Sequence, residues 1–175
     1  MSPRSDDPKH LVLIGLMGSG KTTAGTRAAT ALDRPFVDSD HQIEARTGRT
    51  VREIFESDGE DAFRALETEA LLEALARDEP SVIAAAGGAV LRPENRAAIR
   101  ENARVVWLRA DPEVLVERVA AKGGEHRPLL RDDPLGVLRR MEDDRHELYE
   151  ELADVVVDVG RLPVEEVVEL VVAAA

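Results

Sequence analysis

The sequence predicts a three-layer α/β/α fold with a central five-stranded parallel sheet. Five short apolar segments alternate with longer helical segments, and this alternation is typical of a parallel sheet that helices cover on both faces. A glycine-rich loop follows the first apolar segment and precedes the first helix, as in folds that bind phosphate groups. The chain has 175 residues, which suffice for one domain with a full core.

The predicted strands are short and apolar, as expected for strands that are buried on both faces. They cover residues 11–14, 36–37, 81–85, 105–108 and 155–157. The predicted helices cover residues 22–32, 41–46, 51–58, 61–77, 92–101, 112–121, 135–152 and 163–175. Thr50 and Glu53 have the spacing of a capping box, which predicts that the third helix begins directly after Thr50.

Residues 1–9 are predicted to form a disordered tail and residues 10–175 a single domain. The tail is polar and lacks the apolar segment of a secretion signal. Apolar runs are far shorter than the ~20 residues that span a bilayer, so no membrane partner is expected. Cysteine is absent, which excludes disulfides and thiolate metal sites and is compatible with a cytoplasmic location.

The charge argues against nucleic acid as a partner. Acidic residues exceed basic ones and the net charge is −12. Proteins that bind nucleic acid independently of sequence need a basic surface, which a chain of this charge does not suggest.

Residues 15–23 fit the phosphate-binding pattern G-x-x-x-x-G-K-[ST]. In this pattern backbone N–H groups and the helix N-terminus bind phosphate oxygens, Lys21 reaches the β- and γ-phosphates, and the Thr22 hydroxyl binds Mg²⁺. A chance glycine-rich turn is the alternative, but the flanking strand and helix make it the weaker one. The candidate nucleotide-binding residues are Gly18, Ser19, Gly20, Lys21, Thr22 and Thr23.

Acidic side chains for the metal are expected after the second strand. The third strand ends in small residues without an acid, whereas Asp38 and Asp40 follow the second. Ligands gather at the carboxyl ends of parallel strands, so one aspartate can serve the metal and the other a second substrate. The alternative is a helix cap, for which Ser39 or Asp40 is suited.

Two arginines are candidate anion ligands. Arg64 lies three residues before Glu67 on one helix face, and spacing alone favours a surface ion pair for them. Arg145 occupies an inward position in the apolar series of helix 135–152, so its guanidinium must meet an anion. That anion is either an aspartate of the chain or a bound carboxylate or phosphate.

Two glycine-containing loops complete the candidate site. Gly87 and Gly88 follow the third strand and either allow a ligand to approach the backbone or form a simple turn. Residues 121–134 are basic and contain glycine and proline, which predicts a lid that closes over phosphates. The alternative for this segment is an ordinary exposed loop.

The motifs together resemble the shikimate kinases, which are P-loop kinases. The resemblance covers about residues 11–170, and five motifs occur in the order and with the spacing of that family. They are GLMGSGKTT at 15–23, FVDSD at 36–40, the segment 53–67 with FR at 63–64, RPLL at 127–130, and Arg145 with Tyr149.

This resemblance implies a P-loop kinase fold with a lid and an ATP-dependent phosphorylation of the 3-hydroxyl of shikimate, in aromatic amino-acid and chorismate biosynthesis. It implies that Lys21 and Arg127 stabilise the transferring phosphoryl group. Thr22 and Asp38 would hold the Mg²⁺ cofactor, Asp38 through water, and Asp40 would bind substrate hydroxyls and accept the proton.

The acceptor side follows from the same resemblance. Arg64 and Arg145 would bind the shikimate carboxylate, and the backbone of Gly87 and Gly88 would contact it. Arg161 is a candidate adenine contact. The partners expected are ATP and shikimate, and the protein is expected to be a monomer.

One departure and two rival functions remain. The family usually has three glycines after the third strand, and Ala86 replaces the first, which we expect the site to tolerate. A gluconate-type sugar-acid kinase shares the phosphate loop and the lid and also acts on a carboxylate. A nucleotide-binding protein without turnover is the second rival.

Overall fold

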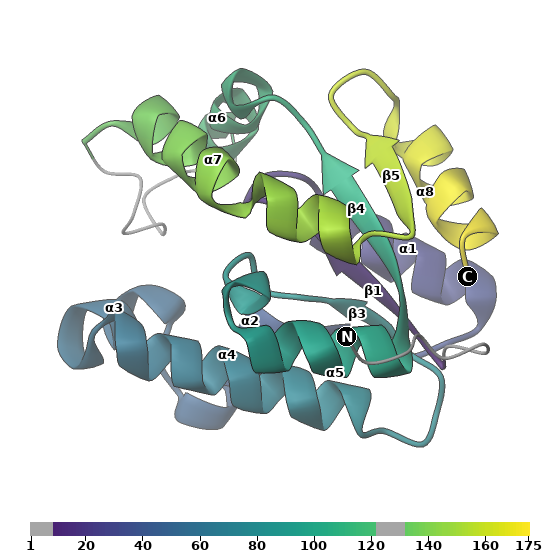
Figure 1. Ribbon diagram of the computed structural model, residues 1–175, viewed down its shortest axis with the longest axis horizontal. Helices are drawn as coiled ribbons and strands as arrows, with labels where there is room; N and C mark the ends of the chain where they lie inside the picture. Colours follow the sequence, from purple (N-terminus) through teal and green to yellow (C-terminus); the bar gives the residue numbers. More distant parts are fainter. Residues whose placement is uncertain (1–8, 122–131) are drawn as a thin grey trace.

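The computed structural model describes residues 9–121 and 132–175, and its centre is a five-stranded parallel sheet of order β2-β3-β1-β4-β5 (Figure 1). The strands are β1 (His10–Ile14), β2 (Phe36–Asp38), β3 (Val82–Ala84), β4 (Ala103–Arg109) and β5 (Val155–Asp158). β1 lies between β3 and β4 and is buried along its whole length. The five predicted strands and their parallel arrangement are confirmed.

Helices lie on both faces of the sheet. In Figure 1, α5 and α7 lie in front of it, whereas α1 and α8 lie behind it and pack on each other. The helices are α1 (Lys21–Leu32), α2 (Ser39–Thr47), α3 (Val51–Asp58), α4 (Glu60–Leu75), α5 (Pro93–Asn102), α6 (Pro112–Ala121), α7 (Pro134–Leu152) and α8 (Val164–Ala173). A 3₁₀ turn, η1 (Ala89–Leu91), was not predicted.

Two hydrophobic clusters organise the interior. The larger one surrounds the sheet and takes in the C-terminal half of α4, with Leu71 and Leu75. The smaller one lies between α2, α3 and α4 and consists of Ile43, Ile54, Phe63 and Ala70. Helix α4 therefore spans both clusters and connects the α2–α3 pair to the sheet.

Helix α2 begins at Ser39, two residues earlier than predicted. The carboxylate of Asp38 accepts hydrogen bonds from the N–H groups of Asp40 (3.1 Å) and His41 (3.3 Å), and this cap starts the helix directly at the end of β2. The helix cap considered as the alternative for this segment is thus present, but it is Asp38 and not Ser39 or Asp40. The capping box of Thr50 and Glu53 is confirmed.

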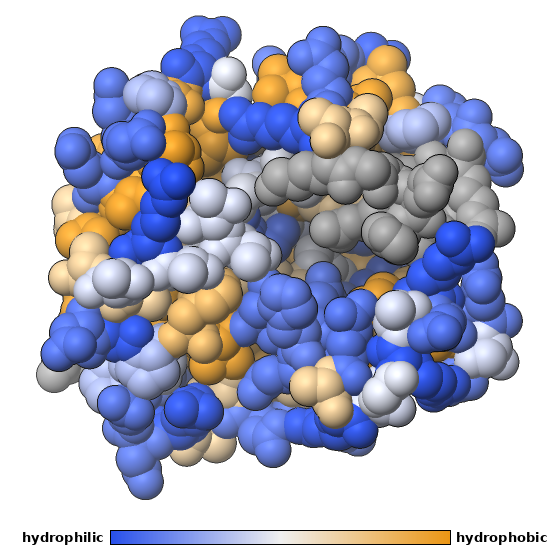
Figure 2. Space-filling view, turned by 180° about the vertical axis from the view of Figure 1, so that it is seen from behind, coloured by the Kyte–Doolittle hydropathy of each residue, from blue (hydrophilic) through white to orange (hydrophobic). Residues whose placement is uncertain are grey.

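The face of the molecule seen in Figure 2 is mostly hydrophilic. Figure 2 shows the face opposite to that of Figure 1, where apolar residues form separate patches among polar and charged ones. No helix within residues 9–121 and 132–175 is long and apolar enough to cross a bilayer. The predicted tail and most of the predicted lid, with Arg127, lie outside the described residues.

Candidate active site

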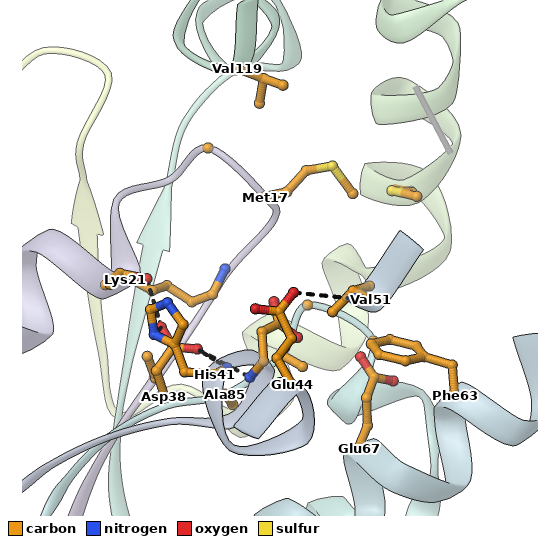
Figure 3. A pocket seen from close by; sticks show the side chains of 18 of the residues that line it. Met17, Lys21, Asp38, His41, Glu44, Val51, Phe63, Glu67, Ala85 and Val119 are labelled. Atoms are coloured by element: carbon orange, nitrogen blue, oxygen red, sulfur yellow. Dashed lines mark hydrogen bonds and ion pairs between the residues drawn. The ribbon is translucent and has the colours of Figure 1, made fainter. Parts of the chain in front are cut away.

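A cavity of about 400 Å³ opens at the carboxyl ends of β1, β2 and β3. Its volume is in the range of small-molecule sites. Figure 3 shows Lys21 of α1 on one side of the cavity, and Phe63 and Glu67 of α4 on the other. The positions after the first three strands therefore converge on one hollow. Residues 109–111 after β4, which the same strand-end rule predicts to converge there, do not line it.

The phosphate loop has a conformation that requires glycine. Gly15, Gly18 and Gly20 have φ angles of 143°, 84° and 91°, in the region that side chains rarely adopt. A Cβ on Gly15 would lie 2.5 Å from the carbonyl oxygen of Leu108. The Nζ of Lys21 folds back over the loop and donates to the carbonyl oxygens of Gly15 (2.7 Å) and Leu16 (3.1 Å).

Oxygen ligands for a cation meet beside the loop. The Thr22 hydroxyl donates to the Oδ2 of Asp38 at 2.7 Å, and the Nδ1 of His41 lies 3.8 Å from the same oxygen. Because the Oδ1 of Asp38 caps α2, the carboxylate is held in one orientation with Oδ2 facing Thr22. One aspartate thus caps α2 and lines the cavity.

Arg64 is held on the opposite side of the cavity. Its Nη1 donates to Glu67 Oε2 (2.6 Å) and its Nη2 to Glu60 Oε1 (2.9 Å). The ion pair that spacing favoured is present, but its predicted place at the surface is wrong, because the Glu67 side chain is only 3% exposed and that of Arg64 only 11%. Burial raises the pKa of Glu67, and the charge of Arg64 opposes that rise.

Arg145 points into the cavity from α7 and is buried, as the helical series predicted. Its Nη1 donates to the carbonyl oxygen of Gly87 at 3.0 Å, and the Tyr149 hydroxyl donates to the same oxygen at 3.1 Å. Among the described residues no ion pair with an aspartate joins Arg145. Of the two anions considered for Arg145, the internal aspartate is therefore not found.

Gly88 is a position where the close approach of a neighbouring side chain favours glycine. A Cβ there would overlap the Nη1 of Arg64, although the φ angle of −89° suits any residue. A Cβ on Gly87 would lie 3.5 Å from the Nη1 of Arg145, which is ordinary contact. Ala86 is buried and lines the same cavity.

Most of the predicted site residues lie together. Ser19 is buried but does not line the cavity, and Arg161 is exposed in the turn after β5, away from it. The predicted residues that line the cavity are Gly18, Gly20, Lys21, Thr22, Thr23, Asp38, Asp40, Arg64, Gly87, Gly88 and Arg145.

Part of the cavity lining is apolar and has no distinctive signal in the sequence. Phe55 and Phe63 pack with ring centroids 4.6 Å apart, and the guanidinium of Arg64 lies 5.8 Å from the centroid of the Phe63 ring. Met17 and Met141 also line the cavity. Apolar periodicity predicts that such residues belong to the hydrophobic core. Only their position at the cavity wall distinguishes them from ordinary core residues.

The family model for shikimate kinase matches residues 17–175. The chain belongs to the shikimate kinase family. The expected family is therefore confirmed, together with the expected P-loop kinase fold. Membership also identifies the chain as a phosphotransferase whose acceptor is an alcohol group, since this is the reaction of the family.

Individual relatives agree with this family. The shikimate kinase of Symbiobacterium thermophilum is 48% identical over 160 residues, which cover 91% of each chain. The solved shikimate kinase of Acinetobacter baumannii, in complex with shikimate, has a TM-score of 0.85 and 35% identity, covering 96% of this chain and 95% of that one.

The rival sugar-acid kinase is structurally more distant. A gluconokinase from Sinorhizobium meliloti matches with a TM-score of 0.63 and 25% identity, covering 95% of this chain and 91% of that one. Both values are below those of the Acinetobacter baumannii shikimate kinase, so the comparison favours the shikimate kinase family.

The residues beside the phosphate loop suit a magnesium ion. Thr22 and Asp38 offer a hydroxyl and a carboxylate, which are the oxygen ligands that this hard cation prefers. Within residues 9–121 and 132–175 no group of three or more His, Asp or Glu side chains could hold an ion. Magnesium keeps several waters and takes substrate phosphates as ligands, so Thr22 as a direct ligand and Asp38 acting through water would suffice.

Proposed function

We propose that the chain transfers the γ-phosphoryl group of ATP to the 3-hydroxyl of shikimate. The observation that carries this proposal is the pair Arg64 and Arg145. They come from different helices, they are mostly buried, and the Nε of each has no hydrogen-bond partner among the described residues. Arg64 donates to Glu60 and Glu67, and Arg145 donates to the carbonyl oxygen of Gly87. The carboxylate of shikimate would give both guanidinium groups a further, charged acceptor.

The neighbourhood of the two arginines supports this acceptor. The guanidinium of Arg64 lies against Gly88, and that of Arg145 donates to the carbonyl oxygen of Gly87. A carboxylate bound between the arginines would therefore also meet the backbone of the two glycines. The solved Acinetobacter baumannii relative, which is in complex with shikimate, supports the same substrate.

The phosphate groups of ATP would bind to Gly18, Ser19, Gly20, Lys21, Thr22 and Thr23. The ammonium group of Lys21, which donates to loop carbonyls, would move to the β- and γ-phosphates and stabilise the negative charge there. Thr22 and Asp38 would hold Mg²⁺, which supplies further neutralisation of phosphate charge.

On the acceptor side, Asp40 would bind substrate hydroxyls and accept the proton of the 3-hydroxyl. Asp40 lies in the first turn of α2 and lines the cavity beside Asp38. Its carboxylate is also near Glu67, since their negative charges interact. The reaction needs in-line placement of the hydroxyl and charge neutralisation more than covalent work by the protein.

Further expectations complete the proposal. Arg127 would stabilise the phosphoryl group from a lid at about residues 121–134, and both remain predictions because that segment lies almost wholly outside the described residues. Arg161 would contact adenine, for which its exposed place after β5 gives no direct support. A monomer in the cytoplasm is expected, and size-exclusion chromatography tests the oligomeric state.

A coupled assay of ADP release tests the function. Purified protein with Mg²⁺ and ATP should release ADP when shikimate is added, and gluconate should give no release above background. Chelation of divalent cations should abolish the activity, and added Mg²⁺ should restore it. ATP binding without shikimate-dependent ADP release would overturn the proposal and favour a non-catalytic protein, and gluconate-dependent release would favour the sugar-acid kinase.

A further inference from the structure

We propose that Tyr149 is a positioning residue that holds the Gly87–Gly88 peptide in the orientation needed to bind the carboxylate of the acceptor. This inference rests on the proposed function, because it concerns the same carboxylate. It adds a residue that would not touch the substrate but would act through the backbone of the two glycines.

The contacts of Tyr149 place its hydroxyl at this peptide. Tyr149 and Arg145 are four residues apart on α7, so their side chains leave the same face of the helix. Both donate to the carbonyl oxygen of Gly87, at 3.1 Å and 3.0 Å. One carbonyl group thus connects a fully buried tyrosine to the cavity arginine.

Substrate binding would make the second donor important. When a carboxylate enters, the donors of Arg145 can turn to it, because a charge-assisted bond is stronger than one to a neutral carbonyl. The carbonyl oxygen of Gly87 would then lose one of its two donors. Tyr149 keeps this partly buried acceptor bonded, so the peptide need not rotate in search of a partner.

The orientation of this carbonyl also determines that of the next N–H. The described chain has no cis peptide bonds, so the N–H of Gly88 points opposite to the carbonyl of Gly87. Within the described residues no hydrogen bond from the N–H of Gly88 is found, and Gly88 lines the cavity. Tyr149 therefore leaves this donor available for an anion.

The hydroxyl of Tyr149 is well suited to a fixed position. Its ring packs on Trp107 of β4 with centroids 5.5 Å apart, and both side chains are buried. Burial raises the pKa of Tyr149 to about 12, so the group remains a protonated donor at ordinary pH. Packing on Trp107 of the sheet thereby fixes the Tyr149 ring, and with it the hydroxyl that bonds to the carbonyl of Gly87.

The variant Tyr149→Phe tests the inference because it removes the hydroxyl and keeps the ring. Binding should be measured by calorimetric titration with shikimate and with its uncharged methyl ester, in wild-type and variant protein. One neutral hydrogen bond is worth about 0.5–1.5 kcal/mol, so the Kd for shikimate should rise about 2- to 12-fold. The ester should lose clearly less affinity, and the kcat and the KM for ATP should stay close to the wild-type values.

Ser81→Ala is the matched control. Ser81 is fully buried, its hydroxyl donates to the carbonyl oxygen of Glu79 at 2.9 Å, and it lies at the amino end of β3, away from the cavity. Ser81→Ala should lose about as much thermal stability as Tyr149→Phe. It should bind shikimate and the methyl ester with wild-type affinity. Equal loss of affinity for shikimate and ester in Tyr149→Phe, or no loss for either, would overturn the positioning role.

A measurement on the native sequence covers the case in which Tyr149→Phe does not fold or the ester binds too weakly. The chain has one tyrosine, so labelling with 3-fluorotyrosine gives a single ¹⁹F resonance. Shikimate should shift this resonance and the ester should shift it less; an unchanged resonance at saturating shikimate would contradict the inference. If wild-type protein binds no shikimate, the proposed function fails instead, so the two failures are distinguishable.

Discussion

At the scale of single residues, the placement of charge gives the cavity its chemistry. Lys21 lines it with the phosphate loop, Arg64 reaches it from α4, and Arg145 reaches it from α7. Glu67 neutralises part of the second positive group, since its carboxylate bonds to Arg64 and its charge is also felt at Arg145. The cavity thus contains two sets of cationic groups. This arrangement suits a nucleoside triphosphate and a carboxylate substrate.

Replacement of Arg145 tests the acceptor end. Arg145→Ala should raise the KM for shikimate about 10- to 100-fold, because a hydrogen bond to a charged group contributes about 1.5–3 kcal/mol. The KM for ATP should change little, as measured by steady-state kinetics. Arg139→Ala is the control on the same helix, where the guanidinium pairs with Glu113 at the surface. An unchanged KM for shikimate in the Arg145 variant would refute the carboxylate contact.

Replacement of the two glycines should give different results although they are neighbours. Gly88→Ala should displace the guanidinium of Arg64 and raise the KM for shikimate about tenfold, roughly the effect of one weakened charged bond. Gly87→Ala should be tolerated, since its Cβ finds ordinary contacts. Thermal unfolding should be nearly unchanged in both, because the flexible end of Arg64 can move. A larger effect at Gly87 than at Gly88 would contradict this steric argument.

At the scale of secondary-structure elements, α4 joins the acceptor side to the sheet. Its N-terminal half carries Arg64 and Glu67 and packs in the small cluster with α2 and α3. Its C-terminal half is part of the main core. The position of the acceptor residues therefore depends on how well the small cluster is formed.

The N-terminal cap of α3 allows a test of how much this helix, which packs in the small cluster, contributes to stability. Thr50 accepts from the N–H of Glu53, and Glu53 accepts from the N–H of Thr50. Thr50→Ala should lower the free energy of unfolding by about 1 kcal/mol, as for other lost helix caps. Urea titration measures the free energy of unfolding. Thr50→Ser should keep the wild-type value because the capping hydroxyl remains. Equal stability of the alanine and serine variants would show that the cap contributes nothing.

At the scale of the whole molecule, His10 links distant segments. The buried imidazole of His10 at the start of β1 bonds to the carbonyl oxygen of Leu75 (3.1 Å), at the end of α4. Its Nδ1 accepts from the N–H of Ser81 (3.1 Å), directly before β3. Because Nδ1 is an acceptor, the bonded form is the neutral tautomer with the proton on Nε2.

This link makes stability depend on pH. Burial lowers the pKa of His10 below 6.5, helped by the positive charges of Lys9 and Arg34 and opposed by the backbone bonds to Leu75 and Arg77. As pH falls, His10 of the unfolded chain binds a proton at a higher pH than His10 of the folded chain. The contribution of His10 to stability is therefore complete above about pH 6.5 and is lost as pH falls toward the lower pKa of the folded state.

The variant His10→Gln isolates this effect, since its amide can donate to Leu75 and accept from Ser81 without titrating. Free energies of unfolding should be measured by urea titration at about pH 7.5 and about pH 5. Wild-type protein should lose more stability between these values than the variant does. The same loss in both proteins would assign the pH dependence to other groups.

Local sequence was sufficient for the elements and for much of the chemistry. Apolar segments, glycines and caps act over a few residues, so the five strands, the phosphate loop and the box at Thr50 could be predicted from adjacent positions. The inward direction of Arg145 also followed from helical periodicity. The resemblance to a family then indicated what the converging groups bind.

Contacts between distant segments depended on the folded arrangement. Arg64 and Glu67 have the spacing of a surface pair, and only the packing of α4 beside Gly88 buries them. The double hydrogen bond to the carbonyl of Gly87, from residues about sixty positions away, has no local signature. Burial and hydrogen-bond partners are properties of the assembled sheet and helices, because they depend on which segments pack together and not on neighbours in the chain.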